Sequence, residues 1–246
     1  MKTKDLSTHI SATYATLRLV LVVIGFVLPP LLWIGGYVFA KEPLAGSLSA
    51  YYYAGDGVMR NWFVGSLFVV GGLLFAYKGY TQLEDYALNF AAGFALLVAL
   101  FPMTGPVRAG DGQTGDNPFS IHGICAAVFF VCIAYVCIFQ ASATVTLIAD
   151  EARRKRYRRK YRTLGILMLL SPVIAFILTL LPWLRNSLIF FVEAAGVYVF
   201  ASYWGVKSWE IRETQADQRA ATGKIQTQQP DKLTDVFRES SVRTVA

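Results

Sequence analysis

The sequence predicts an all-α membrane protein in which six transmembrane helices form one bundle. Two observations predict this fold class. Hydrophobic residues make up 55% of the 246 residues and charged residues only 16%, whereas a soluble domain carries about 25% charged residues. The charges also leave long apolar runs of the length that a helix needs to cross a bilayer. This pattern indicates a multi-pass membrane protein and not the apolar core of a soluble domain.

The membrane domain is expected over residues 19–207, after a polar N-terminal segment at 1–18. Its expected spans are residues 19–40, 61–77, 86–103, 119–149, 165–184 and 187–206. The first span contains Pro29 and Pro30, which predict a kink or a break because proline cannot donate the helical hydrogen bond. This run also ends in small residues after a basic start, as a signal peptide does. Its length and its two central prolines favour a retained helix.

The connections and the tail complete this topology. The short connection between the second and third spans predicts a helical hairpin. The fourth run is too long for a simple span, so we expect it to protrude from the membrane as a helix. Residues 208–246 are rich in polar residues and are expected to be disordered. Cys125, Cys132 and Cys137 lie in one apolar run and are expected to be small buried residues without disulfides.

The distribution of basic residues predicts the orientation. The N-terminal segment, the 2–3 and 4–5 connections and the tail hold 19 Lys and Arg residues, and the other connections hold four. Basic residues accumulate on the cytoplasmic side, so both termini are expected in the cytoplasm of a bacterial-type inner membrane. The basic run Arg153–Arg162 lies on that side, where anionic lipid headgroups attract it. We therefore expect membrane lipids as partners and no nucleic acid.

Glu193 is the most informative single residue, because it lies seven positions inside the sixth span. A carboxylate at that depth usually faces the bundle interior or a wet cavity and has a partner. It either anchors a ligand or makes a hydrogen bond that fixes helix packing. His122 opens the fourth span at the same outer end and is its natural partner.

The first outer loop adds hydroxyl and charged groups to this end. Its tyrosines suit an aromatic belt at the membrane interface or the mouth of a pocket, and Arg60 suits a phosphate or a carboxylate. On the inner face we expect only Lys78 with Glu84 and Asp85, which pin the short hairpin. The expected ligand-binding residues are all at the outer end: Ser47, Ser49, Tyr52, Asp56, Arg60, His122 and Glu193.

Motifs for enzyme chemistry do not occur. The sequence has no G-x-S-x-G, no H-E-x-x-H and no phosphate-binding glycine loop. His9 and His122 are its only histidines, which excludes a three-histidine zinc site from this chain alone. We therefore expect no metal and no cofactor, and catalysis is not favoured.

Several short motifs carry a resemblance to known proteins. They are Ser47-x-Ser49-Ala-Tyr51-Tyr52, Met59-Arg60-Asn61-x-Phe63, Tyr77-Lys78-Gly79-Tyr80-x-x-x-Glu84-Asp85, Ile121-His122 and Phe191-x-Glu193. Together they cover about residues 47–207 and resemble a family of uncharacterised bacterial six-span membrane proteins. The chain is more remotely similar to the DRAM/Frag-like family, which includes lipid-remodelling proteins. Ser49, His122 and Glu193 match that pattern, but tyrosines replace the acidic residues that follow the serine there.

Three functions remain open from the sequence. The favoured one is a binding or transport-like protein whose outward pocket holds a lipid headgroup or a small polar ligand. The second is a structural or assembly subunit, in which polar residues only lock helices together. The third is a lipid-modifying enzyme with His122 and Glu193 as candidate acid and base. Transport is less favoured because the sequence shows no inverted repeat, and a homo-oligomer remains open.

Overall fold

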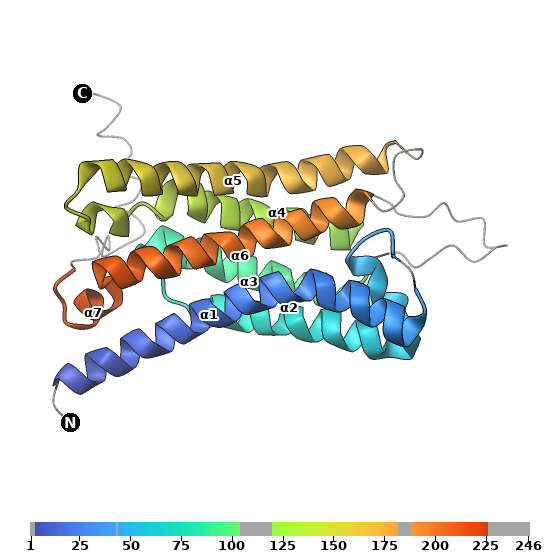
Figure 1. The fold of residues 1–246 in the computed structure, drawn as a ribbon, viewed down its shortest axis with the longest axis horizontal. Helices are drawn as coiled ribbons and strands as arrows, with labels where there is room; N and C mark the ends of the chain where they lie inside the picture. Colours follow the sequence, from blue (N-terminus) through green and yellow to red (C-terminus); the bar gives the residue numbers. More distant parts are fainter. Residues whose placement is uncertain (1–2, 43, 104–119, 182–187, 226–246) are drawn as a thin grey trace.

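The computed structural model describes residues 3–42, 44–103, 120–181 and 188–225. Within these ranges the chain is helical without strands, and six helices are long and apolar enough to cross a membrane (Figure 1). They are α1 (Thr3–Gly35), α2 (Val58–Ala76), α3 (Gln82–Leu100), α4 (Ile121–Tyr135), α5 (Glu151–Thr179) and α6 (Leu188–Thr214). The predicted fold class, an all-α bundle, is confirmed.

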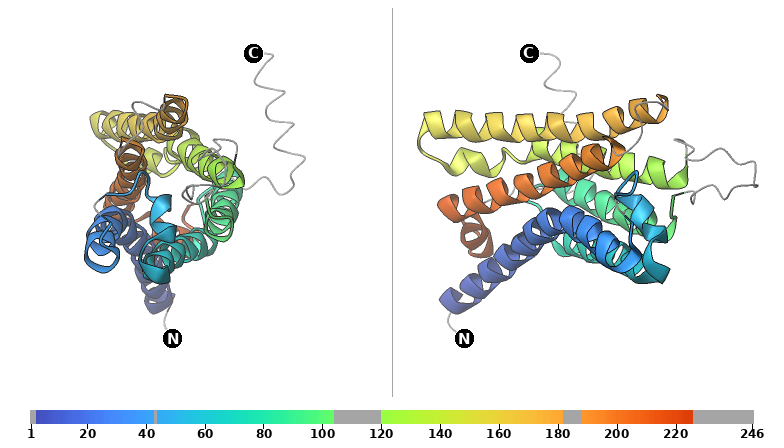
Figure 2. Two further views of the ribbon diagram at one scale, coloured as in Figure 1. Left: turned by 90° about the vertical axis from the view of Figure 1, so that its right-hand side faces the viewer. Right: turned by 45° about the vertical axis from the view of Figure 1, so that its right-hand side comes forward.

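The six helices form a closed ring in chain order. Each long helix packs against the next one along the chain, and α6 returns to pack against α1 (Figure 2). Successive helices run antiparallel, so the bundle has two distinct ends (Figure 1). The start of α1 and the short helix α7 (Ala216–Ala221) lie at one end, here called the terminal end. The loop over residues 44–57 lies at the other, here called the loop end.

Burial divides the ring between an interior and a lipid-compatible surface. One core cluster, around Tyr203 and Trp204, fills the half nearer the terminal end, and a second, around Tyr51 and Met59, fills the half nearer the loop end. Large apolar side chains such as Phe75 remain exposed on the outside of the spans. Apolar exposure on this scale is costly in water and favourable in a bilayer, so the surface agrees with a multi-pass membrane protein.

Helix α1 bends but does not break. It begins at Thr3 and continues through Pro29 and Pro30 to Gly35, and its axis is bent (Figure 2). A π-helical turn, Gly36–Ala40, follows. Residues 3–18, expected as a polar segment before the first span, form the first turns of the same helix. The first turns of α1 contain both polar and apolar residues, because they pack against α7 at the terminal end.

The fourth run does not form the expected protruding helix. Helix α4 ends at Tyr135, and a π-helical turn (Val136–Gln140) and a 3-10 turn (Thr144–Leu147) follow. The chain turns there because Ala141 and Thr144 hydrogen-bond a lysine of α6. Helix α5 extends at this end instead, starting after Asp150, whose carboxylate accepts hydrogen bonds from two backbone N–H groups. The basic run Arg153–Arg162 thus lies on a helix and not in a loop.

The expected disordered tail is wrong for residues 208–225. Helix α6 continues to Thr214, Gln215 takes a left-handed conformation (φ 53°), and α7 folds back against α1. Ile211 and Ala216 are buried against Tyr80, so a few apolar residues suffice to hold this segment. Residues 226–246 lie outside the described part of the chain.

The three cysteines agree with the sequence analysis. All three are free; Cys125 and Cys137 are buried, and Cys132 is half-buried. They lie on α4 and the π-helical turn after it. Their role is therefore packing, as small apolar residues.

Candidate functional site

Glu193 anchors the loop at the loop end of the bundle. Its Oε2 accepts a hydrogen bond of 2.7 Å from the backbone N–H of Leu48. A second link joins the same segments, because the Phe190 N–H donates to the Gly46 carbonyl at 3.0 Å. The carboxylate of α6 thus fixes the loop that precedes α2, which is the packing role that the sequence left open.

Ser47 and Ser49 join the same loop to the end of α3. Both are buried, and their hydroxyl oxygens lie 3.3 Å apart. Each hydroxyl also contacts the sulfur of Met103, at 3.5 and 3.3 Å. Tyr53 adds a hydrogen bond of 2.6 Å to the Met103 carbonyl. These hydroxyls therefore have partners within the chain.

His122 holds the end of α3 and has partners different from those of Glu193. Its Nδ1 lies 2.9 Å from the carbonyl oxygen of Phe101 and 3.2 Å from that of Val98. Since both neighbours are acceptors, Nδ1 carries the proton and donates. The ring is buried at the start of α4. The pairing of His122 with Glu193 that the sequence suggested is thus replaced by two separate loop anchors.

Arg60, which is exposed, and Tyr52, which is half-buried, contact each other in the predicted site. The guanidinium carbon of Arg60 lies 5.7 Å from the centroid of the Tyr52 ring, a cation–π contact. Asp56 is exposed in a tight turn between Gly55 and Gly57, and all three residues have positive φ. Of the predicted residues, Arg60 and Asp56 are therefore exposed, Tyr52 and Glu193 are half-buried, and Ser47, Ser49 and His122 are buried.

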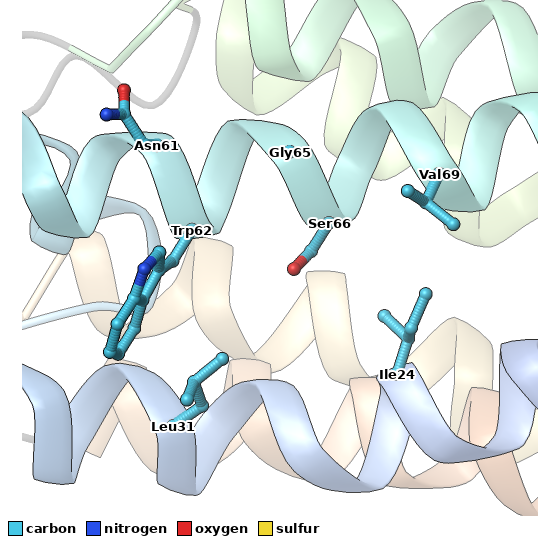
Figure 3. Close-up of a pocket in the computed structure, with 7 residues that line it drawn as sticks. All are labelled: Ile24, Leu31, Asn61, Trp62, Gly65, Ser66 and Val69. Carbon is cyan, nitrogen blue, oxygen red and sulfur yellow. The ribbon is translucent and has the colours of Figure 1, made fainter.

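A groove lies between α1 and α2 beside Arg60. It has a volume of 320 Å³ and opens sideways, and Trp62 and Ser66 of α2 point toward Leu31 and Ile24 of α1 (Figure 3). Its full lining is Ile24, Leu31, Asn61, Trp62, Gly65, Ser66 and Val69. Asn61 lies at its loop end, directly after Arg60 in the chain. The groove is largely apolar, with the hydroxyl of Ser66 midway along it and Asn61 at its loop end.

A second polar cluster lies at the terminal end, and the sequence analysis missed it. Arg18 of α1 makes a bidentate pair with Asp217 of α7, with Nη2–Oδ2 at 2.7 Å and Nη1–Oδ1 at 3.3 Å. The side chains are 2% and 5% exposed. Tyr80, in the connection after α2, donates to Asp217 at 2.5 Å. Burial, more than neighbouring charge, raises the pKa of Tyr80 well above its usual range, so its hydroxyl stays a donor.

Lys207 of α6 lies in the same cluster and uses all three ammonium protons. Its Nζ donates to the Ala141 carbonyl at 3.0 Å, to Thr144 Oγ1 at 2.7 Å and to Glu210 Oε2 at 3.2 Å. Thr144 and Tyr161 also donate to that Glu210 oxygen, at 2.9 and 3.0 Å. Lys207 and Glu210 are 1% and 0% exposed, which is tolerable only because they are paired.

Glu84 turns into this cluster from the start of α3. It is 1% exposed, and its Oε2 accepts a hydrogen bond of 2.8 Å from the Tyr80 N–H. Lys78 instead pairs loosely with Asp85, at 3.9 Å. The expectation that the inner face has only a clamp of Lys78 with both acids is therefore wrong. A Cβ at Gly79 would lie 2.6 Å from Glu84 Cγ, so glycine there makes room for the buried acid.

The sequence contained one usable signal for this cluster. Lys207, Glu210 and Thr214 are spaced at i, i+3 and i+7, on one face of a continued α6. Ending the membrane domain at residue 207 and assigning residues 208–246 to a disordered tail hid this periodicity. Asp217 and Arg18 carried no such signal, because their pairing joins the two ends of the chain.

Fold and sites together define a multi-pass, all-α membrane protein with a polar cluster buried at each end of the bundle. Within the described residues, no three or more His, Cys, Asp and Glu side chains are grouped to hold a metal ion. A comparison with family models, curated proteins and solved structures finds no match for the chain.

Proposed function

We propose that this protein binds a membrane lipid at its loop end. An acyl chain occupies the groove between α1 and α2, and the headgroup meets Arg60. The observation that carries this proposal is an apolar groove between two membrane-spanning helices, with a cation and an amide next to its loop end. It narrows the broader expectation of a lipid headgroup or a small polar ligand.

The groove favours a lipid because of where it opens. Val69 of α2, which lines the groove, and Val27 of α1, one turn from Ile24, are exposed. This face of the bundle therefore meets hydrocarbon, and an acyl chain is the occupant available there. A buried methylene contributes about 0.8 kcal/mol when it leaves water but far less from lipid, so shape and headgroup contacts decide retention.

The headgroup contact rests on Arg60. An exposed guanidinium at the end of a span matches a phosphate bidentately, and the contact with Tyr52 holds it near the groove. Asp56 lies in the same loop and disfavours a second anionic group. Ser47, Ser49 and Glu193 act indirectly, since they hold the loop that carries Tyr52 and precedes the helix of Arg60. His122 holds the end of α3, next to Met103, to which that loop is joined.

The orientation remains part of the proposal. The excess of Lys and Arg at the terminal end favours that end in the cytoplasm of a bacterial-type inner membrane. With this orientation, the polar end of the groove faces the headgroups of the outer leaflet. The resemblance to the DRAM/Frag-like family points to lipids as well.

A structural or assembly role is the second candidate, and one observation favours it. Glu193, Ser47 and Ser49 have hydrogen-bond partners within the chain, as residues that only lock helices do. The catalytic alternative needs His122 and Glu193 at one reacting atom, and their hydrogen bonds go to different segments. We therefore do not propose catalysis.

The test is native mass spectrometry of the full-length protein, released gently from membranes, with identification of retained lipids. Gly65 lines the groove, and a Cβ there meets nothing within 4 Å, so Gly65→Leu places a larger side chain at the groove lining without a clash at Cβ. Gly72→Leu is the matched control, because Gly72 lies on the same helix, is exposed and is equally unobstructed. We expect wild type and Gly72→Leu to retain a lipid and Gly65→Leu to lose it.

Arg60→Gln tests the headgroup contact separately. We expect it to lower the share of phosphate-containing lipid roughly tenfold, the size of one charge-assisted contact of about 1.5 kcal/mol. Equal lipid retention by all four proteins would contradict lipid binding in the groove and favour the structural role.

A further inference from the structure

Buried acids outnumber buried bases in the terminal-end cluster. Arg18 with Asp217 and Lys207 with Glu210 each form a neutral pair. Glu84 is left over and fully buried, and its carboxylate accepts a hydrogen bond from the uncharged N–H of Tyr80. An ionised carboxylate in that position costs several kcal/mol unless a positive charge accompanies it.

Four side-chain oxygen atoms are buried and have no hydrogen-bond partner within the described residues. They are Ser208 Oγ and three carboxyl or phenol oxygens: Glu84 Oε1, Glu210 Oε1 and the Tyr203 hydroxyl. The second oxygen of each carboxylate is engaged, so the side chains are held in place. Buried oxygens in folded proteins almost always have a partner, so these three indicate a group that the protein binds.

The three oxygens belong to side chains arranged around Lys207 and Tyr80. Lys207 Nζ bonds Glu210 and lies 5.5 Å from the Tyr80 ring centroid, and the Tyr80 N–H bonds Glu84. Tyr161, whose hydroxyl donates to Glu210, packs against Tyr203 with ring centroids 5.9 Å apart. Residues of α3 and α6 thus converge on one region of the core.

We propose that Glu84, Glu210 and Tyr203 bind one exchangeable monovalent cation. The ligand is a proton shared by the carboxyl groups, or a sodium or potassium ion held by the three oxygens. Unit charge is required because the excess is one carboxylate, and a divalent ion would reverse the imbalance beside Lys207. Intramembrane acids with such partners mark ion-binding positions. This site lies at the opposite end from the lipid groove and does not depend on it.

The experiment uses the full-length protein in detergent, with two readouts. The first is the unfolding temperature in sodium, potassium or choline chloride at equal ionic strength, since a bound ion stabilises the folded state. The second is the infrared carbonyl band of a protonated carboxylic acid. Wild type is compared with Glu84→Gln and with Asp85→Asn, a control that neutralises the neighbouring, more exposed acid.

For an alkali ion, wild type and Asp85→Asn melt at a higher temperature in sodium or potassium than in choline, and Glu84→Gln does not. For a proton, wild type and Asp85→Asn show the acid band, and Glu84→Gln loses it. If Glu84→Gln fails to fold, Tyr203→Phe tests the proposal instead, because it removes one of the three oxygens and keeps the packing of the ring. We expect Tyr203→Phe to weaken the alkali response or to shift the acid band. Wild-type protein with neither an alkali response nor an acid band overturns the proposal.

Discussion

Arg18 and Asp217 are 199 residues apart in the sequence and form a bidentate ion pair at 2.7 Å inside the terminal end. The pair closes the ring of helices, because it joins the first span to the helix that follows the last one. Tyr80 hydrogen-bonds the same carboxylate. One carboxylate therefore connects the beginning, the middle and the end of the described chain.

We expect Asp217→Ala to destabilise the protein by about 3–5 kcal/mol, because it leaves a guanidinium buried without its partner. Thermal unfolding in detergent measures the change, and limited proteolysis near α7 reports whether that helix is released. Glu151→Ala is the control, because its pair with Lys155 is exposed and contributes about 0.5 kcal/mol or less. Equal effects of the two variants would show that the buried pair is not structural.

Glu193→Gln and Glu193→Ala separate the role of Glu193 in packing from a direct role in ligand binding. The amide oxygen of glutamine still accepts from the Leu48 N–H, whereas alanine removes the acceptor. As a loop anchor, Glu193→Ala costs about 1–3 kcal/mol and Glu193→Gln clearly less. Stability and retained lipid are measured on the same samples. A glutamine variant of full stability that loses its lipid would instead make Glu193 a direct ligand contact.

Gly196→Ala is expected to loosen the packing of α6 on α5. A Cβ at Gly196 would lie 2.4 Å from Ser171 Oγ, and that hydroxyl is held by the Val192 carbonyl. Overpacking of this kind costs about 1–3 kcal/mol. Gly205→Ala, on the same helix with nothing within 4 Å, should be neutral or slightly stabilising. Unfolding temperatures of both variants check this, and a neutral Gly196→Ala would contradict the close contact.

We expect the protein to lose stability at alkaline pH because the hydroxyl of Tyr80 is buried. Burial raises the pKa of Tyr80 in the folded protein, whereas the unfolded chain ionises near the ordinary value of about 10. The contribution of Tyr80 to the free energy of unfolding is thus complete below pH about 10 and falls as the pH rises above that value. Wild type should lose more stability there than Tyr80→Phe. Tyr37→Phe, an exposed control, should follow wild type, and identical slopes for all three would refute the prediction.

Local composition was enough to place the spans. Each of the six expected ranges overlaps an observed helix, because hydropathy and length are properties of short segments. The boundaries were less predictable. Expected residues 61–77 became Val58–Ala76, whereas the fifth span lengthened to Glu151–Thr179, since polar residues at its start continue the same helix. Hydropathy alone does not detect a helix that leaves the membrane.

The loop-end residues were identified by type but not by partner. A carboxylate within a span had to have a partner, and the sequence named His122; the structure gives Glu193 the Leu48 N–H. A backbone group as partner is invisible in the sequence, because every residue carries one. The same limitation hid the partners of His122, two carbonyl groups at the end of α3.

The sequence by itself determined the membrane class, the number of spans and the side on which basic residues gather, because these depend on composition along short stretches. Only the tertiary structure decided the order of helices around the ring and the burial of Arg18, Glu84, Lys207, Glu210 and Asp217 in one cluster. A charged residue near the end of a span is equally compatible with water and with the interior. Which of the two it meets depends on a partner from a distant segment, and folding alone brings that partner into contact.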